Sequence, residues 1–134
     1  MQLKSMFGKK SIKKRVLVVE DDALLAKILV EKHEREGFLV SVVENGLEVA
    51  DTVKSFSPNL IILDLIIPGI DGFAVLKQLK ANTATEKIPV VILSNLGDEG
   101  DIRSGKALGA EEYFIKSNVE VKKIVDFVKK RLGV

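Results

Sequence analysis

LIILDLIIPGIDG, residues 60–72, opens with four apolar residues and places an aspartate, Asp64, directly behind them. Leu60–Leu63 has no polar position on either side, which predicts a strand buried on both faces of a parallel sheet. Pro68–Gly69 follows in the order that a type II turn favours. The stretch therefore predicts a central strand whose carboxyl end carries an acid and leads through a turn.

Apolar runs of strand length alternate with segments of helical period on both sides of this stretch. The other strands are predicted at residues 16–19, 38–43, 90–93 and 113–115. Helices are predicted at residues 23–36, from Asn45 onward, around Phe73, Leu76 and Leu79, at 102–108 and at 121–132. Five such units predict an α/β fold with a five-stranded parallel sheet and helices on both faces.

Polar side chains directly follow four of the five predicted strands. They are Glu20 and Asp21, then Asp64, then Ser94, and finally Lys116. Ligands of open parallel sheets bind at the carboxyl ends of the strands, so we expect these side chains to meet. Taken singly, an acid after a strand is more often a helix cap or a solvated loop residue. The four positions together favour a shared site.

Four segments carry a resemblance to a known family: VLVVEDD (16–22), LIILDLIIPGIDG (60–72), VVILSN (90–95) and GAEEYFIKS (109–117). They resemble the signature segments of bacterial response-regulator receiver domains, and the similarity runs from Arg15 to the end of the sequence. The first two segments together are highly specific for this family, whereas the Ser94 and Lys116 segments are specific only when they occur with the first two. The resemblance implies a flavodoxin-like (βα)5 fold with strand order 2-1-3-4-5.

The resemblance also implies a chemistry. Asp64 matches the residue that accepts a phosphoryl group. Mg²⁺ would be held by Glu20, Asp21, Asp64 and the backbone carbonyl of Ile66. Three clustered carboxylates repel one another, so we expect the proton affinity of at least one to rise, and a hard divalent cation to relieve the repulsion.

Three further residues complete the implied site. Ser94 matches the hydroxyl that meets the phosphoryl group, and Lys116 matches the lysine that pairs with it. Tyr113 matches the aromatic switch residue, although a half-buried strand aromatic is the alternative. A phosphoryl group adds negative charge, and its pull on Ser94 would bias a two-state surface.

Composition limits the other function classes. Cysteine is absent, which excludes disulfides and thiolate zinc sites and suits a cytoplasmic protein. No apolar run is long enough for a transmembrane segment. Residues 1–14 are expected to be a flexible basic extension with five lysines, and removing these from the 21 Lys and Arg leaves 16 basic against 19 acidic residues. The basic pI therefore comes from the extension, which either contacts an anionic surface or is a disordered or vector-derived extension.

The expected function is that of a two-component signalling protein. A histidine kinase or histidine phosphotransfer protein is the expected phosphodonor, and we expect no enzyme activity beyond self-phosphorylation and slow autodephosphorylation. An aspartyl phosphatase of the haloacid-dehalogenase type is a rival, but it needs a second Asp where Ile66 stands. A second rival is a binding module of receiver shape that no longer uses phosphorylation. Because residues 15–134 are taken up by the receiver, we expect no DNA-binding domain, output through an unidentified protein, and a phosphorylation-dependent dimer as one alternative.

Several local expectations can be checked directly. Asp22 is expected to cap the first helix, with Leu24, Leu25, Ile28 and Leu29 on its buried face and His33 exposed. Ser117 stands where the family usually has proline, so we expect a trans peptide after Lys116. Ser117 and Glu120 match a capping box for the last helix, and Lys116 should still reach the acids.

Overall fold

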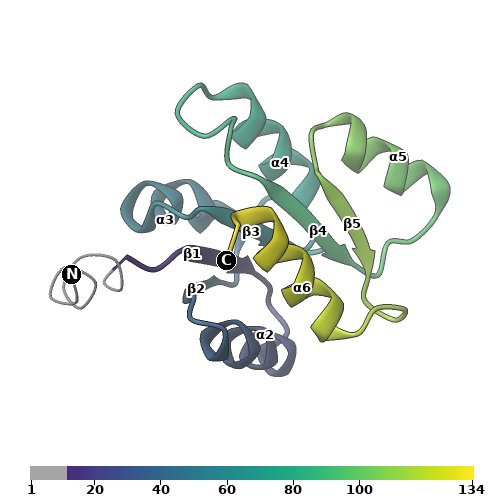
Figure 1. Ribbon diagram of the computed structural model, residues 1–134. Coiled ribbons are helices and arrows are strands. Elements are labelled where there is room, and N and C mark those ends of the chain that lie inside the picture. The colour runs from purple at the N-terminus through teal and green to yellow at the C-terminus, as the bar shows by residue number, and fades with distance from the viewer. Residues whose placement is uncertain (1–11) are drawn as a thin grey trace, which may run out of the picture.

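A computed structural model describes residues 12–134. Its five strands form one parallel sheet in the order β2-β1-β3-β4-β5, which confirms the expected topology (Figure 1). The strands are β1 (Arg15–Val19), β2 (Leu39–Val43), β3 (Leu60–Leu63), β4 (Val90–Ser94) and β5 (Glu112–Ile115). The predicted strands all occur, and none differs at either end by more than one residue.

The helices lie in two layers, one on each face of the sheet (Figure 1). Buried side chains of α3 and α4 pack with one face, and Ile102 of α5 packs against the same cluster. Buried side chains of α2 and α6 pack with the other face. The helical elements are α2 (Ala23–Arg35), a 3-10 turn η2 (Gly46–Glu48), α3 (Val49–Phe56), α4 (Gly72–Ala81), α5 (Glu99–Ala107) and α6 (Val121–Leu132).

Strand β3 supplies both halves of the core. All four of its residues are buried, with Ile61 and Leu63 in one cluster and Leu60 and Ile62 in the other. This alternation follows from the two-residue period of a strand. β3 pairs with β1 through Val19↔Leu63, so the residues that follow the two strands emerge side by side.

Asp22 caps α2 as expected, since its Oδ1 accepts hydrogen bonds from the amides of Leu24 (3.0 Å) and Leu25 (3.1 Å). Helix α5 begins at Glu99, three residues before the predicted start. Its cap explains the difference, because Asp98 Oδ1 accepts from the Asp101 amide at 2.8 Å and so satisfies the first turn.

The buried face of α2 agrees in part with the predicted one, since Leu29 is buried and Leu25 packs against the core. Leu24 is 68% exposed, while Ala26, Leu29 and His33 are buried. The expectation that His33 is exposed is wrong: its ring packs 5.9 Å from the Phe38 ring, and its Nδ1 lies 2.7 Å from the Leu29 carbonyl. The positions three and four residues apart face the sheet, and burial lowers the pKa of His33.

Of the two expectations for the loop after β5, the trans peptide bond is confirmed and the capping box is not. No cis peptide bond occurs within residues 12–134, so the Lys116–Ser117 bond is trans. The capping box is wrong, because α6 starts at Val121 and its N-cap, Glu120, makes no side-chain cap hydrogen bond. The amides of Asn118 and Val119 instead bond to the Ile115 carbonyl, which inserts a turn before the helix.

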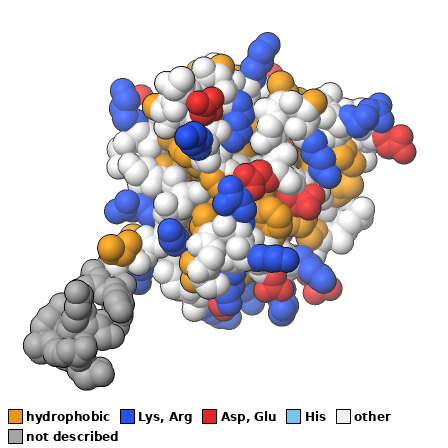
Figure 2. Space-filling view, turned by 45° about the horizontal axis from the view of Figure 1, so that its top comes forward, with side chains coloured by type: hydrophobic (Ala, Val, Ile, Leu, Met, Phe, Trp, Pro, Cys, Tyr) orange, Lys and Arg blue, Asp and Glu red, His pale blue; other side chains and the backbone are white. Residues whose placement is uncertain are grey.

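Residues 1–11 of the basic extension lie outside the described residues, so its expected flexibility and surface contact stay predictions. Figure 2 shows basic and acidic side chains interspersed on the visible face rather than gathered into one basic patch. Among residues 12–134, no helix is long and apolar enough to cross a membrane.

Candidate functional site

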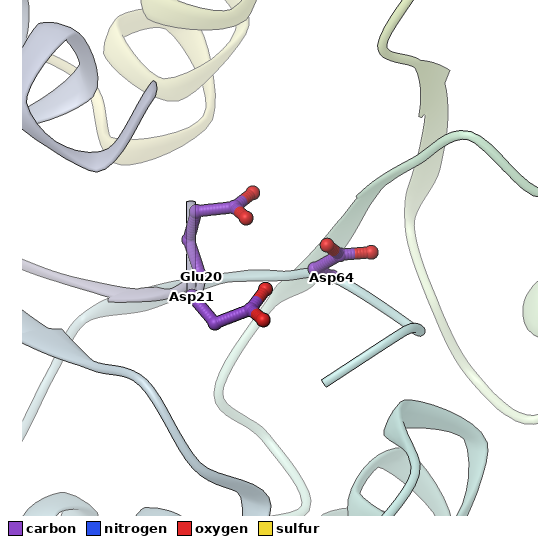
Figure 3. Close-up of side chains that lie close together, drawn as sticks. All are labelled: Glu20, Asp21 and Asp64. Carbon is purple, nitrogen blue, oxygen red and sulfur yellow. The ribbon is translucent and has the colours of Figure 1, made fainter. Parts of the chain in front are cut away.

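An acidic cluster lies at the carboxyl ends of β1 and β3. Glu20 and Asp21 directly follow β1, and Asp64 directly follows β3. One carboxylate oxygen from each residue lies within 4.8 Å of the others, and Figure 3 shows the three side chains side by side. The parallel register of β1 and β3 therefore brings together three acids that are up to 44 positions apart in the sequence.

The three acids differ in exposure. Glu20 is 1% and Asp64 3% exposed, whereas Asp21 is exposed to solvent. Burial raises the pKa of Glu20, and the nearby Asp64 charge adds to the rise, although hydrogen bonds from Lys116 and from the Asp22 amide oppose it. The expected rise in proton affinity thus falls on Glu20, the most buried acid.

Lys116 reaches the cluster from the end of β5. Its Nζ donates to Asp64 Oδ2 at 2.7 Å and to Glu20 Oε2 at 3.1 Å, so the predicted reach is confirmed. Burial lowers the pKa of Lys116, but the hydrogen bonds and charges of Asp64 and Glu20 outweigh this and raise it overall. The ammonium group therefore stays charged and offsets part of the repulsion among the acids.

The two remaining predicted switch residues meet at the loop after β4. Ser94 is fully buried, and its Oγ accepts a hydrogen bond from the Leu96 amide at 3.3 Å. Tyr113 is 8% exposed, and its hydroxyl donates to the Leu96 carbonyl. Burial, followed by the charges of Asp101, Asp98 and Asp64, raises the pKa of Tyr113 to about 12. The main chain of Leu96 thus links both side chains, a connection that side-chain types alone did not predict.

The loop after β3 is fixed by backbone contacts. Asp64 Oδ1 accepts from the Ile66 amide at 3.1 Å, and the Gly72 amide donates to the Leu65 carbonyl at 2.9 Å. The Gly46 amide donates to the Pro68 carbonyl at 2.9 Å. Ile66 itself is 55% exposed beside the cluster. The role of its carbonyl as a metal ligand stays a prediction.

The cluster has the donor set that Mg²⁺ prefers. Mg²⁺ binds through oxygens, usually one or two carboxylates, and keeps several waters. Glu20 Oε1 is buried and lacks a hydrogen bond, although Lys116 Nζ lies 2.9 Å away as an ionic neighbour. The buried carboxylates of Glu20 and Asp64 beside the exposed Asp21 are suited to a hydrated cation. The residues therefore fit the metal that the resemblance implies.

Residues 16–129 match the family model described as response regulator receiver domain. The chain belongs to the response-regulator receiver domain family. The 2-1-3-4-5 sheet, except for its first residue Arg15, and the acids at the ends of β1 and β3 lie within the matched region. The expected fold and family are thereby confirmed.

This receiver domain is similar to several known proteins. It is 34% identical over 122 residues to the DNA-binding response regulator MtrA of Mycobacterium bovis, covering 91% of this chain and 52% of MtrA. The Mn²⁺-bound form of response regulator Rcp1 is 28% identical, with a TM-score of 0.75 and coverage of 87% of this chain and 92% of that one. The phosphorylated cyanobacterial phytochrome response regulator RcpA is also 28% identical, with a TM-score of 0.75 and coverage of 90% and 91%.

One expectation about partners needs correction. The receiver domain spans about half the length of the curated relative MtrA, which is a DNA-binding response regulator. The expectation of no DNA-binding domain, with output only through another protein, is therefore wrong as an inference from this sequence. It treated the receiver as the whole protein, whereas relatives carry as much chain again outside the matched region.

Proposed function

We propose that this receiver domain takes a phosphoryl group onto Asp64 from a histidine kinase or histidine phosphotransfer protein. The observation that carries the proposal is the contact of the Lys116 ammonium group with the nearly buried Asp64 at 2.7 Å, beside two further acids. A lone structural ion pair would need no third carboxylate, and three like charges in one place are costly without a cation.

The reaction needs little covalent work from the protein. An Asp64 carboxylate oxygen attacks the phosphorus of a phosphohistidine, a P–O bond forms, and the P–N bond breaks. The histidine nitrogen keeps the electron pair and takes a proton, while Asp64 becomes an acyl phosphate. Lys116, already on Asp64 Oδ2, is placed to pair with the phosphoryl oxygens. Positioning and charge stabilisation are the main contributions in such transfers.

Mg²⁺ is the proposed cofactor, with Glu20, Asp21, Asp64 and the Ile66 carbonyl as its protein ligands. When bound, it neutralises charge on the transferring phosphoryl group. The Mn²⁺-bound form of Rcp1 supports a divalent cation in this family, and the phosphorylated RcpA supports phosphorylation. Burial of Glu20 further supports the site, since a cation offsets the energetic cost of a desolvated carboxylate.

The domain is proposed to signal rather than to turn over a substrate. After phosphorylation, Ser94 would turn toward the phosphoryl group and leave the amide of Leu96, the residue whose carbonyl accepts the Tyr113 hydrogen bond. That change would alter the surface formed by α5 and β5. Its only reactions would be self-phosphorylation and slow autodephosphorylation. A cytoplasmic location is part of the proposal and is supported by family membership.

Intact mass spectrometry tests the proposal. Incubation with Mg²⁺ and acetyl phosphate should add one phosphoryl group to the wild type and none to Asp64→Asn. Asp71→Asn is the matched control, because Asp71 is an exposed acid in the same loop and only caps α4. An unmodified wild type, or a fully modified Asp64→Asn variant, would contradict the proposal.

Metal binding has its own readout. Free Mn²⁺ has an electron paramagnetic resonance signal that falls when the ion binds protein, so a titration measures affinity without any phosphodonor. We expect Asp21→Asn to weaken binding severalfold, with Asp22→Asn as the control, since Asp22 caps α2 through its Oδ1. Equal affinities in the two variants would rule out the proposed ligand set.

A further inference from the structure

Gly105 lies in the middle of α5 and is the one residue of that helix that is buried. Glycine is unfavourable in a helix interior because the unfolded chain has more backbone freedom to lose. The sequence alone therefore presents Gly105 as a weak point of α5. Its surroundings give another reason for a residue without a side chain.

The position of Gly105 leaves no room for a methyl group. A Cβ built there would lie 2.6 Å from Ile92 Cδ1 and 3.2 Å from both Cδ2 and Cε2 of the Tyr113 ring. Ile92 and Tyr113 are register partners on the adjacent strands β4 and β5, so they stand side by side beneath the helix. An alanine methyl would therefore press on the two side chains at once.

The two neighbours differ in their freedom to move. Ile92 is fully buried in the middle of the core, so its Cδ1, the atom that the methyl would meet at 2.6 Å, is closely surrounded. Tyr113 is on β5, the edge strand of the sheet, and retains 8% exposure. A methyl at position 105 would therefore strike Ile92 Cδ1 and also press on the Tyr113 ring, which is the neighbour with room to move outward from under α5.

We propose that Gly105 is a positioning residue, which holds the Tyr113 ring inward so that its hydroxyl meets the Leu96 carbonyl beside Ser94. The contact ties β5 to the loop whose Leu96 amide bonds to Ser94 Oγ. Removing the space under α5 would break this tie without changing any member of the acidic cluster. The placement of the ring stands on packing alone, whereas its coupling to phosphorylation rests on the proposed function.

The chain offers a direct probe of this ring. It has one tyrosine and no tryptophan, so intrinsic fluorescence comes from Tyr113. Acrylamide quenching at neutral pH then measures how accessible the ring is, with no metal or phosphodonor present. Gly105→Ala should raise the quenching constant severalfold over wild type. An unchanged constant in folded Gly105→Ala would overturn the proposal.

Two further variants separate positioning from a general effect on α5. Gly100→Ala is the matched control, since it makes the same change in the same helix and its Cβ would meet only Asp98 Oδ1, at 3.4 Å. It should leave the quenching constant unchanged. Ile92→Val removes the Cδ1 atom that the new methyl would strike, so Ile92→Val/Gly105→Ala should return the constant toward wild type and also restore folding if Gly105→Ala alone fails to fold. A folded double variant whose quenching constant stays as far above the wild-type value as that of Gly105→Ala, or as high as that of the unfolded chain, would contradict the steric argument.

The coupling is tested separately with Mg²⁺ and beryllofluoride, a stand-in for the phosphoryl group. Beryllofluoride should lower the quenching constant of Gly105→Ala, because a Ser94 that has turned favours the inward ring. No change in a variant that binds beryllofluoride would overturn the coupling while leaving the ring placement to the first comparison. Failure of the wild type to bind beryllofluoride would instead count against the proposed function.

Discussion

Replacing Lys116 with methionine should destabilise the domain and make its stability depend on pH and on Mg²⁺. The change keeps an unbranched side chain, shorter by one atom, but removes the ammonium group 2.7 Å from Asp64 and 2.9 Å from Glu20. Removing one partner of a buried ion pair typically costs 3–5 kcal/mol, and we expect about 3 kcal/mol near neutral pH. The lower end applies because the Lys116 side chain is 17% exposed and Asp21 is exposed to water.

The pH dependence follows from Glu20. Its pKa is already raised above 4.5 by burial, and losing the Lys116 hydrogen bond raises the pKa further. Between pH 4.5 and that raised pKa, the folded protein holds a proton that the unfolded chain releases. The free energy of unfolding of Lys116→Met should therefore rise as pH falls through this window, by up to about 1.4 kcal/mol per pH unit. Added Mg²⁺ should restore stability at high pH.

Urea denaturation with and without Mg²⁺, at about pH 8 and about pH 5, measures these effects. Lys122→Met is the control, because the Lys122–Asp126 pair has side chains 80% and 52% exposed and should contribute little. Equal free energies for the two variants, or a Lys116→Met variant whose loss of stability is the same at both pH values, would refute the reasoning.

Other predictions concern kinetics, exchange and pH. Because Ile66 and Leu96 offer no side-chain hydrogen bond to orient a water, the acyl phosphate should last for hours, and a half-life of seconds by phosphate release would contradict this. Helix α5 buries only Gly105 whereas α6 buries three apolar side chains, so hydrogen exchange should show α5 opening first; equal protection would be the contrary result. Burial lowers the pKa of His33, so the unfolded chain takes up a proton below pH 6.5 before the folded one, and stability should fall as pH drops below 6.5. His33→Gln should lack that part of the pH dependence in denaturation curves, and an identical dependence would argue against it.

The parts of the fold that depend on short-range patterns could be predicted from the sequence. Leu60–Leu63 is apolar at every position, and the structure buries all four residues, since a central strand is covered on both faces. The acids after β1 and β3 meet because parallel strands place their carboxyl ends at one edge. The same rule predicted that Lys116, which follows β5, contacts both buried acids.

Features that depend on three-dimensional packing could not be predicted. His33 has polar neighbours in the sequence, but the phase of α2 turns it onto the Phe38 ring. Ser117 has the right spacing for a capping box, yet a turn closed on the Ile115 carbonyl delays α6 until Val121. The reason for a glycine at position 105 is the close approach of Ile92 and Tyr113, and helix propensities carry no information about such tertiary neighbours.

The central claim is that Asp64 receives the phosphoryl group, and locating that group is the most direct test. After reaction with Mg²⁺ and acetyl phosphate, borohydride reduces an acyl phosphate of aspartate to homoserine, which peptide mass spectrometry assigns to one position. The account predicts homoserine at residue 64 and at no other acid of the cluster. Homoserine at position 21, or the alcohol that reduction of a glutamyl phosphate gives at position 20, would contradict it. So would the absence of any reduction product in a protein that binds Mg²⁺.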